Sequence, residues 1–400
     1  MDISYFGLAL CVVSFIVVWY NYPWVMGQAR RWKVIDNPDA RKLQRNPVPV
    51  LGGMSVFVGI VTGAVFLMLR EWQFSLLVML MAMGALLVVG ILDDKFGLPV
   101  WFRFVVEILA VLGMIAFNGN MIDNFHGLFG IYGIPFYVAL PLSVFVGVGI
   151  INAINLIDGV DGYSSGYIVL SCIFFSMIFH CSQMHALSLT CLICACSLIP
   201  FYLHNVFGVK SKMFIGDGGT LMLGTLMTAL VFSMLRTGSL CETLKFHNVS
   251  LVASSLAILA VPIIDTLRVM TCRMLRGQSP FKPDKTHLHH IFIDLHFSHF
   301  LAGFICILLN SIVVAVWFVG WKIGAGVNAQ LAIVCTTMVL VDPVLYVVLR
   351  HHEKHDTPLY RQICGFAETT NLEKTKLWSW VNRLVDGSKA NGLDDTTKNI

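Results

Sequence analysis

Charged residues are scarce in this chain: Lys, Arg, Asp and Glu make up 12% of its 400 residues, about half of their usual share in soluble domains. Hydrophobic residues make up 57%, and the mean hydropathy is +0.77. This balance excludes a soluble globular domain and indicates a membrane protein. Internal repeats and low-complexity tracts are also lacking, so the sequence gives no sign of a repeat architecture.

Cysteines fall mostly inside the apolar runs of this chain. Of the eleven cysteines only Cys241 lies clearly in a loop expected outside the membrane, which argues against disulfides. The C-x-x-C-x-C of residues 191–196 could suggest zinc, but it lies within LTCLICACSLIP and has no polar ligands beside it. Buried apolar thiols are therefore the better interpretation.

Eleven apolar runs approach the roughly 20 residues that a helix needs to cross a bilayer. They are 3–20, 50–69, 74–92, 104–117, 134–153, 163–180, 187–203, 219–235, 250–270, 298–319 and 329–349. The first run lacks the basic segment and cleavage site of a signal peptide, so we expect it to remain as a helix. The sequence thus predicts an all-α polytopic protein with a transmembrane domain over 1–350 and a polar tail over 351–400.

The loops fix an expected orientation. If the N-terminus lies outside, all basic residues lie on the inside except four, which are Arg70, Arg236, Lys245 and Lys322. The positive-inside rule therefore predicts a cytoplasmic C-terminus, and a net charge of +4 gives no reason to expect nucleic acid. Within the tail, apolar residues between Leu377 and Val385 share one helix face, which fits either a helix lying on the membrane or a docking helix.

Acidic residues collect at the inside ends of the spans. Asp93 and Asp94 in ILDDKFGL end an inward-running helix, where anions oppose the helix dipole unless a cation lies nearby. Solvated helix-end charges are the simple alternative for this pair.

The stretch NAINLIDGVDG, residues 152–162, ends an apolar run with two amides and two carboxylates, which are Asn152, Asn155, Asp158 and Asp161. Neighbours at a spacing of three are offset by about 60° on a helix, so the four converge only if the helix ends here. Gly159 and Gly162 permit that. The ligand spacing of a calcium loop is absent. Two carboxylates this close raise each other's pKa unless a cation or a proton lies between them, which favours a functional site.

Two further loops complete the polar set. In FIGDGGT, residues 214–220, Asp217 or Thr220 could cap the following helix, or Asp217 could bind a hard cation beside a phosphate-sized gap left by the glycines. The loop RMLRGQSPFKPDKTHLHHIF, residues 273–292, has His spacing that is poor for zinc. Its Arg, Lys and His residues instead form a cluster of donors that suits a diphosphate. Oxygen ligands and phosphate donors together predict magnesium-assisted phosphoryl transfer to a lipid acceptor.

The motifs LDDKFGL (92–98), NAINLIDGVDG, FIGDGGT and SPFKPDKTHLHHIF (279–292) occur in this order. Through them the chain resembles the polyprenyl-phosphate N-acetylhexosamine-1-phosphate transferases, glycosyltransferase family 4. A basic loop ending in PVPVLGG (47–53) extends the resemblance. The P-D-x-x-H-x-H-H form of the last motif is most similar to the bacterial branch that uses UDP-N-acetylglucosamine. The branch that uses a muramyl-pentapeptide nucleotide for peptidoglycan is the alternative, and an ion-coupled transporter is a more distant one.

The resemblance implies transfer of a sugar-1-phosphate from a UDP-sugar to undecaprenyl phosphate, with release of UMP, as the first membrane step of a cell-surface glycan. It implies Mg²⁺, or Mn²⁺ in its place, on Asn155 and Asp217, and a multi-pass protein of the bacterial inner membrane that is compatible with a homodimer. Asp93 or Asp94 would deprotonate or orient the lipid phosphate. The remaining implied site residues are Asp158 and Asp161 as catalytic groups, and Arg45, Asn152, Arg276, His287, His289 and His290 as substrate-binding groups.

The chain departs from the family pattern at two places. Gly218-Gly219-Thr220 stands where Ala-Gly-Ser is common, and Leu288 stands where Ile is usual. Small size, a hydroxyl group and an apolar side chain are kept, so the implied roles are unchanged.

Overall fold

The computed structural model of this protein describes residues 3–36, 47–281 and 285–387. Within these ranges ten helices are long and apolar enough to cross a membrane, and a bent pair makes an eleventh span. The ten are α1 (Ile3–Arg31), α2 (Gly52–Arg70), α3 (Phe74–Phe96), α4 (Val100–Asn118), α5 (Phe136–Leu156), α6 (Tyr163–Cys181), α7 (His185–Phe207), α8 (Gly216–Leu235), α12 (His299–Lys322), and the run of α13 (Val327–Val339), η2 (Leu340–Val344) and α14 (Leu345–Lys354). The all-α class is confirmed, as are ten of the eleven predicted spans, and the eleventh is a bent pair of helices.

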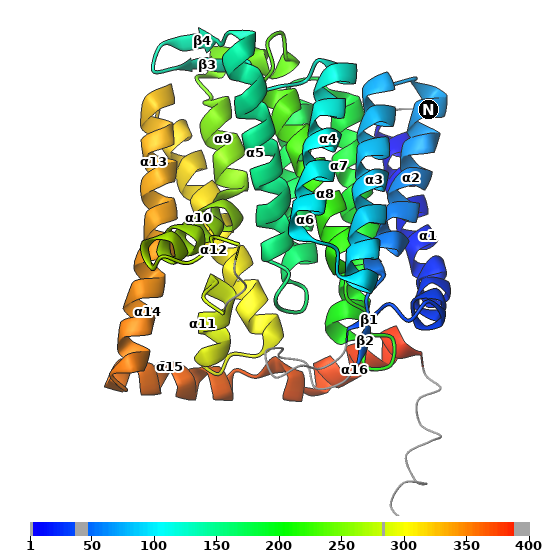
Figure 1. Cartoon of the computed structure of the whole chain (residues 1–400), viewed down its shortest axis with the longest axis vertical. Helices are drawn as coiled ribbons and strands as arrows, with labels where there is room; N and C mark the ends of the chain where they lie inside the picture. Colours follow the sequence, from blue (N-terminus) through cyan, green and yellow to red (C-terminus); the bar gives the residue numbers. More distant parts are fainter. Residues whose placement is uncertain (1–2, 37–46, 282–284, 388–400) are drawn as a thin grey trace, which may run out of the picture.

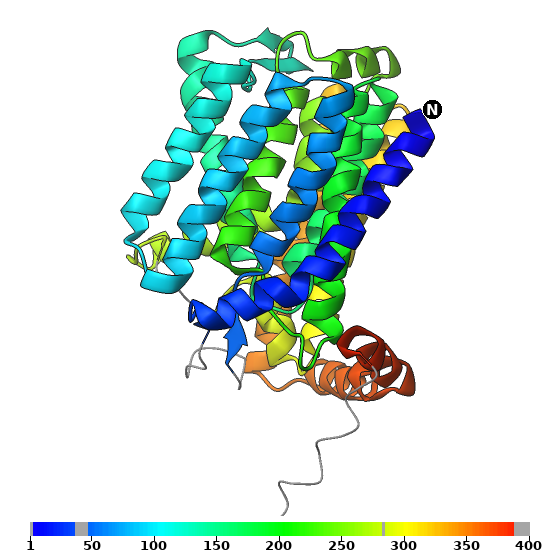
Figure 2. The same ribbon diagram turned by 90° about the vertical axis from the view of Figure 1, so that its right-hand side faces the viewer.

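The helices form one upright bundle (Figure 1), along one edge of which α1 runs at a slant (Figure 2). Its centre is α8, whose apolar window is 94% buried. Glycines allow this packing, because α8 meets α3 and α2 backbone against backbone. A Cβ on Gly90 of α3 would lie 2.3 Å from Cα of Gly218, and a Cβ on Gly53 of α2 would lie 2.3 Å from Cα of Gly219.

The run 250–270, expected to be one straight span, is broken. Helices α9 (Leu251–Ile258) and α10 (Ala260–Leu275) meet at an angle of 75°. Pro262 is the reason, since it cannot donate to the carbonyl of Ile258 and its ring would clash there. That carbonyl instead accepts hydrogen bonds from Asn310 Nδ2 (3.0 Å) and the Tyr167 hydroxyl (2.7 Å), so the break leaves it satisfied inside the bundle.

Short elements cover the two ends of the bundle (Figure 1). One end carries the antiparallel hairpin β3 (Asn124–Leu128) and β4 (Ile131–Gly133), with η1 (Leu240–His247). The other carries the antiparallel pair β1 (Ile35–Asp36) and β2 (Val48–Pro49), with α11 (Leu288–Asp294), α15 (Pro358–Thr369), η3 (Leu372–Lys374) and α16 (Lys376–Asp386). The amphipathic helix expected in the tail is α16. The strand β2 leads into a bridge between Val50 and Phe214, which ties it to the FIGDGGT segment.

Candidate active site

A pocket of about 820 Å³ opens at the end of the bundle that carries β1, β2 and α16. This volume is typical of small-molecule sites, roughly 300–1,000 Å³. Segments that are distant in sequence form its wall. Residues of the three acidic motifs and of the histidine motif therefore line one pocket. Six of the residues predicted from the sequence line it: Asp94, Asn155, Asp158, Asp161, Asp217 and His290.

Arg103 on α4 organises the acids at one side of this pocket. Its Nη1 lies 3.3 Å from Asp93 Oδ2 and 3.8 Å from Asp217 Oδ2, and its Nε lies 3.4 Å from Glu107 Oε1. Glu107 is fully buried and accepts a hydrogen bond from Asn152 Nδ2. Arg103 is therefore the cation that the acids at the end of α3 require. The motifs contain neither Arg103 nor Glu107, and the only sequence signal for them is an i, i+4 charge pair inside an apolar run.

Asp93 and Asp94 have different surroundings. Asp93 Oδ1 accepts the backbone N–H of Leu98 at 2.8 Å, and its other oxygen faces Arg103. Asp94 Oδ2 is buried without a hydrogen-bond partner among the described residues, and Asp94 lines the pocket. A Cβ on Gly216 would lie 2.6 Å from this oxygen, so the glycine leaves space beside it. Protein groups thus engage both oxygens of Asp93, whereas Asp94 lines the pocket and keeps one buried oxygen without a hydrogen-bond partner among the described residues.

Asn155 and Asp217, predicted as metal ligands, lie side by side. Asn155 Nδ2 donates to Asp217 Oδ1 at 2.9 Å and to Thr220 Oγ1 at 2.8 Å. Neither Asp217 nor Thr220 caps α8, whose N-cap is Ile215 without a side-chain bond, so the capping alternative is wrong. The Asp217 side chain is 39% exposed. Its carboxylate therefore remains accessible from the pocket.

Asn155 and Asp217 fit a magnesium site that is completed by other ligands. Among the residues that the structure describes, no group of three or more His, Cys, Asp and Glu could hold a metal ion by itself. Magnesium commonly takes one or two carboxylates and completes its shell with water and substrate phosphates. One carboxylate and one amide at the pocket wall suit such a site, in which the substrate supplies the remaining ligands.

The glycines of FIGDGGT serve a different purpose from the expected one. Gly218 and Gly219 are buried against Gly90 and Gly53, as described above, so they provide helix contacts rather than a phosphate-sized gap. Only Gly216, with φ of +76°, combines a left-handed backbone with a position on the pocket wall.

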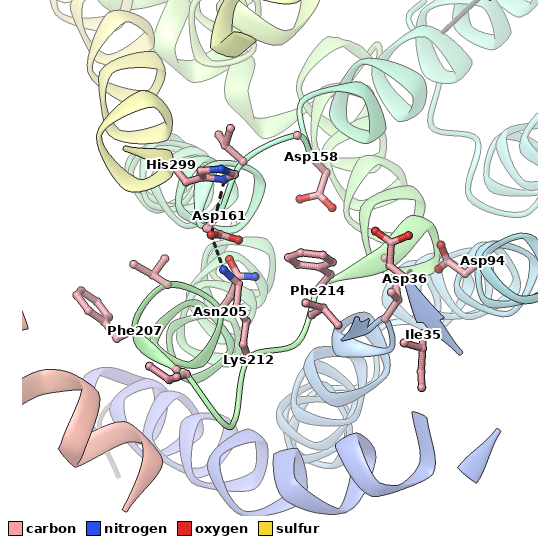
Figure 3. A pocket seen from close by; sticks show the side chains of 18 of the residues that line it. Ile35, Asp36, Asp94, Asp158, Asp161, Asn205, Phe207, Lys212, Phe214 and His299 are labelled. Carbon is pink, nitrogen blue, oxygen red and sulfur yellow. Dashed lines mark hydrogen bonds and ion pairs between the residues drawn. The ribbon is translucent and has the colours of Figure 1, made fainter. Parts of the chain in front are cut away.

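Asp158 and Asp161 lie in the loop between α5 and α6, and both line the pocket (Figure 3). Asp161 Oδ2 lies 2.6 Å from Lys212 Nζ and 3.8 Å from His299 Nδ1. Asp158 accepts a hydrogen bond from the Ser164 hydroxyl. Although the pocket leaves part of its surface accessible, the enclosing protein desolvates this carboxyl and raises its pKa to about 7, and nearby Asp217 adds to the shift. Lys212 relieves the expected repulsion at Asp161, and the raised pKa of Asp158 favours its neutral form.

The two glycines of this loop act by different means. Gly162 has φ of +75° at the start of α6, which confirms the expected helix break. Gly159 is needed for space, because a Cβ there would lie 2.0 Å from His289 Nε2. The imidazole of His289 therefore packs directly on the backbone of the NAINLIDGVDG loop.

The histidine motif is held by buried charges on the broken span. His287 Nδ1 lies 2.9 Å from Asp265 Oδ2, and the other Asp265 oxygen accepts the backbone N–H of Leu288 at 3.0 Å. Asp265 also pairs with Arg268, whose Nε lies 2.7 Å from Asp342 Oδ1. This arrangement fixes the orientation of the His287 ring.

His289 and His290 lie deeper than the expected cluster of charged donors requires. His289 is buried, and both its ring nitrogens are without a hydrogen-bond partner among the described residues. Burial lowers the pKa of His290 to about 4 and holds that of His289 well below its usual value. Both rings are therefore neutral near pH 7, and each offers one N–H donor rather than a positive charge.

The remaining predicted residues fall elsewhere. Asn152, His287 and His289 lie behind the lining of the pocket, and Arg276 is exposed at the end of α10, away from it. Arg45 lies outside the described residues. The structure adds Asp36 and Lys212 to the pocket wall, neither of which belongs to a motif.

The chain is similar to known proteins over most of its length. The family model described as "Glycosyl transferase family 4" matches residues 76–235, from α3 to α8. Undecaprenyl-phosphate alpha-N-acetylglucosaminyl 1-phosphate transferase of Yersinia pestis is 30% identical over 300 residues, which cover 72% of this chain and 78% of that protein. The protein with the same name from Escherichia coli strain K12 is 29% identical over 278 residues, covering 68% and 72%.

A third relative matches over a similar share of the chain. The "probable undecaprenyl-phosphate N-acetylglucosaminyl 1-phosphate transferase" of Bacillus subtilis strain 168 is 31% identical over 313 residues, which cover 75% of this chain and 81% of that protein. The matches extend beyond the acidic motifs over most of the chain. They confirm the resemblance that the motifs indicated: this chain belongs to glycosyl transferase family 4, among its membrane-bound sugar-1-phosphate transferases.

Proposed function

We propose that this protein transfers N-acetylglucosamine-1-phosphate from UDP-N-acetylglucosamine to undecaprenyl phosphate and releases UMP. The observation that carries the proposal is the group of Asp94, Asn155 and Asp217 at a pocket wall where three membrane helices end. A soluble diphosphate and the phosphate of a membrane lipid can meet at such a boundary. The acceptor and the sugar come from the names of the relatives, and a muramyl-pentapeptide nucleotide is the second donor to test.

The proposed reaction is one displacement at phosphorus. An oxygen of the lipid phosphate attacks the β-phosphorus of the donor and forms a new P–O bond, while the bond from that phosphorus to the bridging oxygen breaks and UMP leaves. Asp94 is a better candidate than Asp93 for orienting the lipid phosphate and accepting its proton, because Asp94 lines the pocket, whereas Asp93 does not and has both oxygens engaged by protein groups.

Asp217 and Asn155 would hold Mg²⁺ against the diphosphate, where the cation would neutralise the charge that develops during transfer. Arg103 keeps Asp93 and Asp217 at a fixed separation behind this position. His290 and Lys212 present N–H groups to the same pocket, and Asp161 directs the lysine. Donor groups held in place in this way bind the UDP-sugar at a lower cost in conformational freedom.

We place the pocket on the cytoplasmic side of a bacterial inner membrane, where UDP-sugars are made. The loops richest in Lys and Arg lie at the pocket end of the bundle, as the positive-inside rule requires for that side. In this orientation the product would be the first lipid-linked intermediate of a surface glycan. A transporter remains less well supported: buried Asp265 and Asp342 on or beside the broken span are paired with Arg268, and Asp265 orients a site histidine.

The test uses membranes that contain the protein, undecaprenyl phosphate and a panel of UDP-sugars, with lipid products identified by mass and UMP quantified. We expect a product with UDP-N-acetylglucosamine, its loss in excess EDTA, and its recovery with Mg²⁺ or Mn²⁺. Asp217→Asn should abolish turnover. Glu71→Gln should not, because Glu71 follows the end of α2 that lies away from the pocket. Absence of a product with every UDP-sugar, or full activity in EDTA, would refute the proposal.

A further inference from the structure

The C-terminal helix α16 lies against the pocket at the side away from the metal-binding acids. Trp378 and Asn382 of α16, together with Glu373 just before it, are part of the pocket lining. In Figure 3 the C-terminal segment, in salmon, lies beside Phe207, while Asp94 and Asp36 lie at the other side. Building on the proposed function, we propose that α16 completes the donor-binding pocket, with Trp378 as its end wall and Asp386 fixing the turn that carries Lys212.

Aromatic packing holds Trp378 in this wall. Its ring centroid lies 4.5 Å from that of Phe207 at the end of α7 and 5.3 Å from that of Phe300 at the start of α12. With its amide oriented to satisfy its neighbours, Asn382 donates from Nδ2 to the carbonyl oxygens of Phe207 (2.9 Å) and Trp378 (3.1 Å). The helix is thus attached to α7 by both apolar and polar contacts.

Asp386, the last residue of α16, binds the turn that follows α7. Its two carboxylate oxygens accept the backbone N–H groups of Val209, Lys210 and Ser211 at 3.0–3.1 Å, and the Ser211 hydroxyl at 2.6 Å. Partial burial opposes the charge, but these four hydrogen bonds outweigh it and hold the pKa of Asp386 below its usual value. A charged acceptor with four donors is a strong anchor.

The same turn connects α16 to the polar centre of the pocket. Ser211 is also bonded to His204 Nδ1 (2.9 Å) through its hydroxyl and to the Tyr22 hydroxyl (2.8 Å) through its carbonyl. The next residue is Lys212, whose Nζ lies 2.6 Å from Asp161. Lys212 therefore directly follows the anchored Ser211, and the position of the lysine depends on Asp386.

The outer face of α16 provides a control. Leu377, Trp380 and Leu384 are 69%, 53% and 56% exposed, and none of them lines the pocket. Trp380 is thus a tryptophan on the same helix, two residues from Trp378, that faces away from the site. If α16 served only to attach the tail to the membrane surface, Trp380 would matter and Trp378 would not.

The position of α16 defines the part of the reaction that it influences. The acids at the opposite side hold the reacting phosphates, so α16 can contact only the portion of the donor remote from them. An aromatic wall beside a lysine and an amide suits a flat nucleobase or a sugar ring equally. Either way, the affinity for the donor should depend on α16, while the lipid acceptor and the chemical step should not.

The experiment measures steady-state kinetics of the purified full-length enzyme with UDP-N-acetylglucosamine and undecaprenyl phosphate. For Trp378→Ala and Asp386→Asn we expect the KM for the UDP-sugar to rise at least tenfold, with kcat and the KM for the lipid within about twofold of wild type. Trp380→Ala should match the wild type in all three, and Asp386→Glu should recover most of the donor affinity. A parallel rise in the inhibition constant of UMP assigns the contact to the nucleotide, and an unchanged one assigns it to the sugar.

Thermal unfolding of each variant separates loss of binding from loss of fold. If Trp378→Ala does not yield folded protein, Trp378→Leu, which keeps apolar volume without a flat ring, answers the same question. Two outcomes would overturn the role of α16 and leave the proposed function intact. One is a donor KM within twofold of wild type in the Trp378 and Asp386 variants, and the other is an equal rise in the lipid KM. No wild-type turnover with any UDP-sugar refutes the proposed function and this inference together.

Discussion

Replacement of Arg103 by alanine would remove the cation that three carboxylates share. Glu107 dominates the energetics because its side chain is fully buried, whereas those of Asp93 and Asp217 are 14% and 39% exposed. At a charge separation of about 4 Å and an effective dielectric constant of about 20, one such contact is worth about 4 kcal/mol before desolvation. Loss of one partner from a buried pair typically costs about 3–5 kcal/mol. We therefore expect Arg103→Ala to lower the free energy of unfolding by about 3 kcal/mol.

The same substitution should lower turnover more than stability alone explains. Without Arg103, Asp93 and Asp217 repel each other, and the carboxylate assigned to the metal loses its fixed position. If this loss of alignment raises the activation free energy by about 3 kcal/mol, turnover falls about a hundredfold, since about 1.4 kcal/mol corresponds to a factor of ten. Rates of UMP release at saturating substrates, with thermal unfolding measured in the same detergent, test both numbers.

Two further variants make the interpretation specific. Lys95→Ala removes an exposed cation next to the same acids in sequence, and it should change neither quantity. The double variant Arg103→Ala/Glu107→Gln removes the uncompensated buried charge, so stability should recover while turnover stays low. Turnover of Arg103→Ala within fivefold of wild type would refute the reasoning, as would recovery of turnover in the double variant.

Three other predictions follow from the site. Gly159→Ala should displace His289 and reduce turnover at least tenfold, whereas Gly149→Ala, where a Cβ has open space, should not; equal effects would contradict the close contact. Asp265→Asn and Asp342→Asn should both lower thermal stability, because each removes an ion pair with Arg268. Only Asp265→Asn should also reduce kcat, because only Asp265 contacts His287. The pKa of Asp158 is about 7 in the folded protein and about 4 in the unfolded chain, so the folded state binds the proton more tightly. The free energy of unfolding, measured in EDTA, should therefore fall as the pH rises from about 4 to about 7. Asp158→Asn should flatten that fall, and an unchanged pH profile would count against the raised pKa.

Much of the fold follows from hydropathy, because a bilayer forces backbone groups to pair within each span. Most spans end within five residues of the apolar runs, and even the short run 104–117 forms α4, but α1 continues to Arg31, well beyond the run 3–20. The bend at Leu259 was not predicted because Pro262 lies in an unbroken apolar run, and prolines such as Pro141 and Pro200 lie inside continuous helices of the same chain. What distinguishes Pro262 is the tertiary partner Asn310, which satisfies the freed groups.

The site divides in the same way. Spacing within NAINLIDGVDG predicts a helix end and a set of converging polar groups, because those depend on local geometry. The partners of these groups do not follow from the sequence: Arg103 reaches Asp217 across more than a hundred residues, and Lys212 reaches Asp161 across two helices. The sequence of FIGDGGT suggests that its glycines leave room for a ligand, because it does not reveal that α2 and α3 pack against them.

The glycine contacts of α8 determine how deep in the bilayer the proposed reaction occurs. Gly218 and Gly219 touch Gly90 and Gly53 backbone to backbone, directly after Asp217. The carboxylate therefore cannot move along the membrane normal unless α2 and α3 move with it. A polyprenyl chain keeps its phosphate close to the membrane surface, so donor and acceptor can meet only within a narrow layer. The height of that layer is set by the positions of four glycines along three helices.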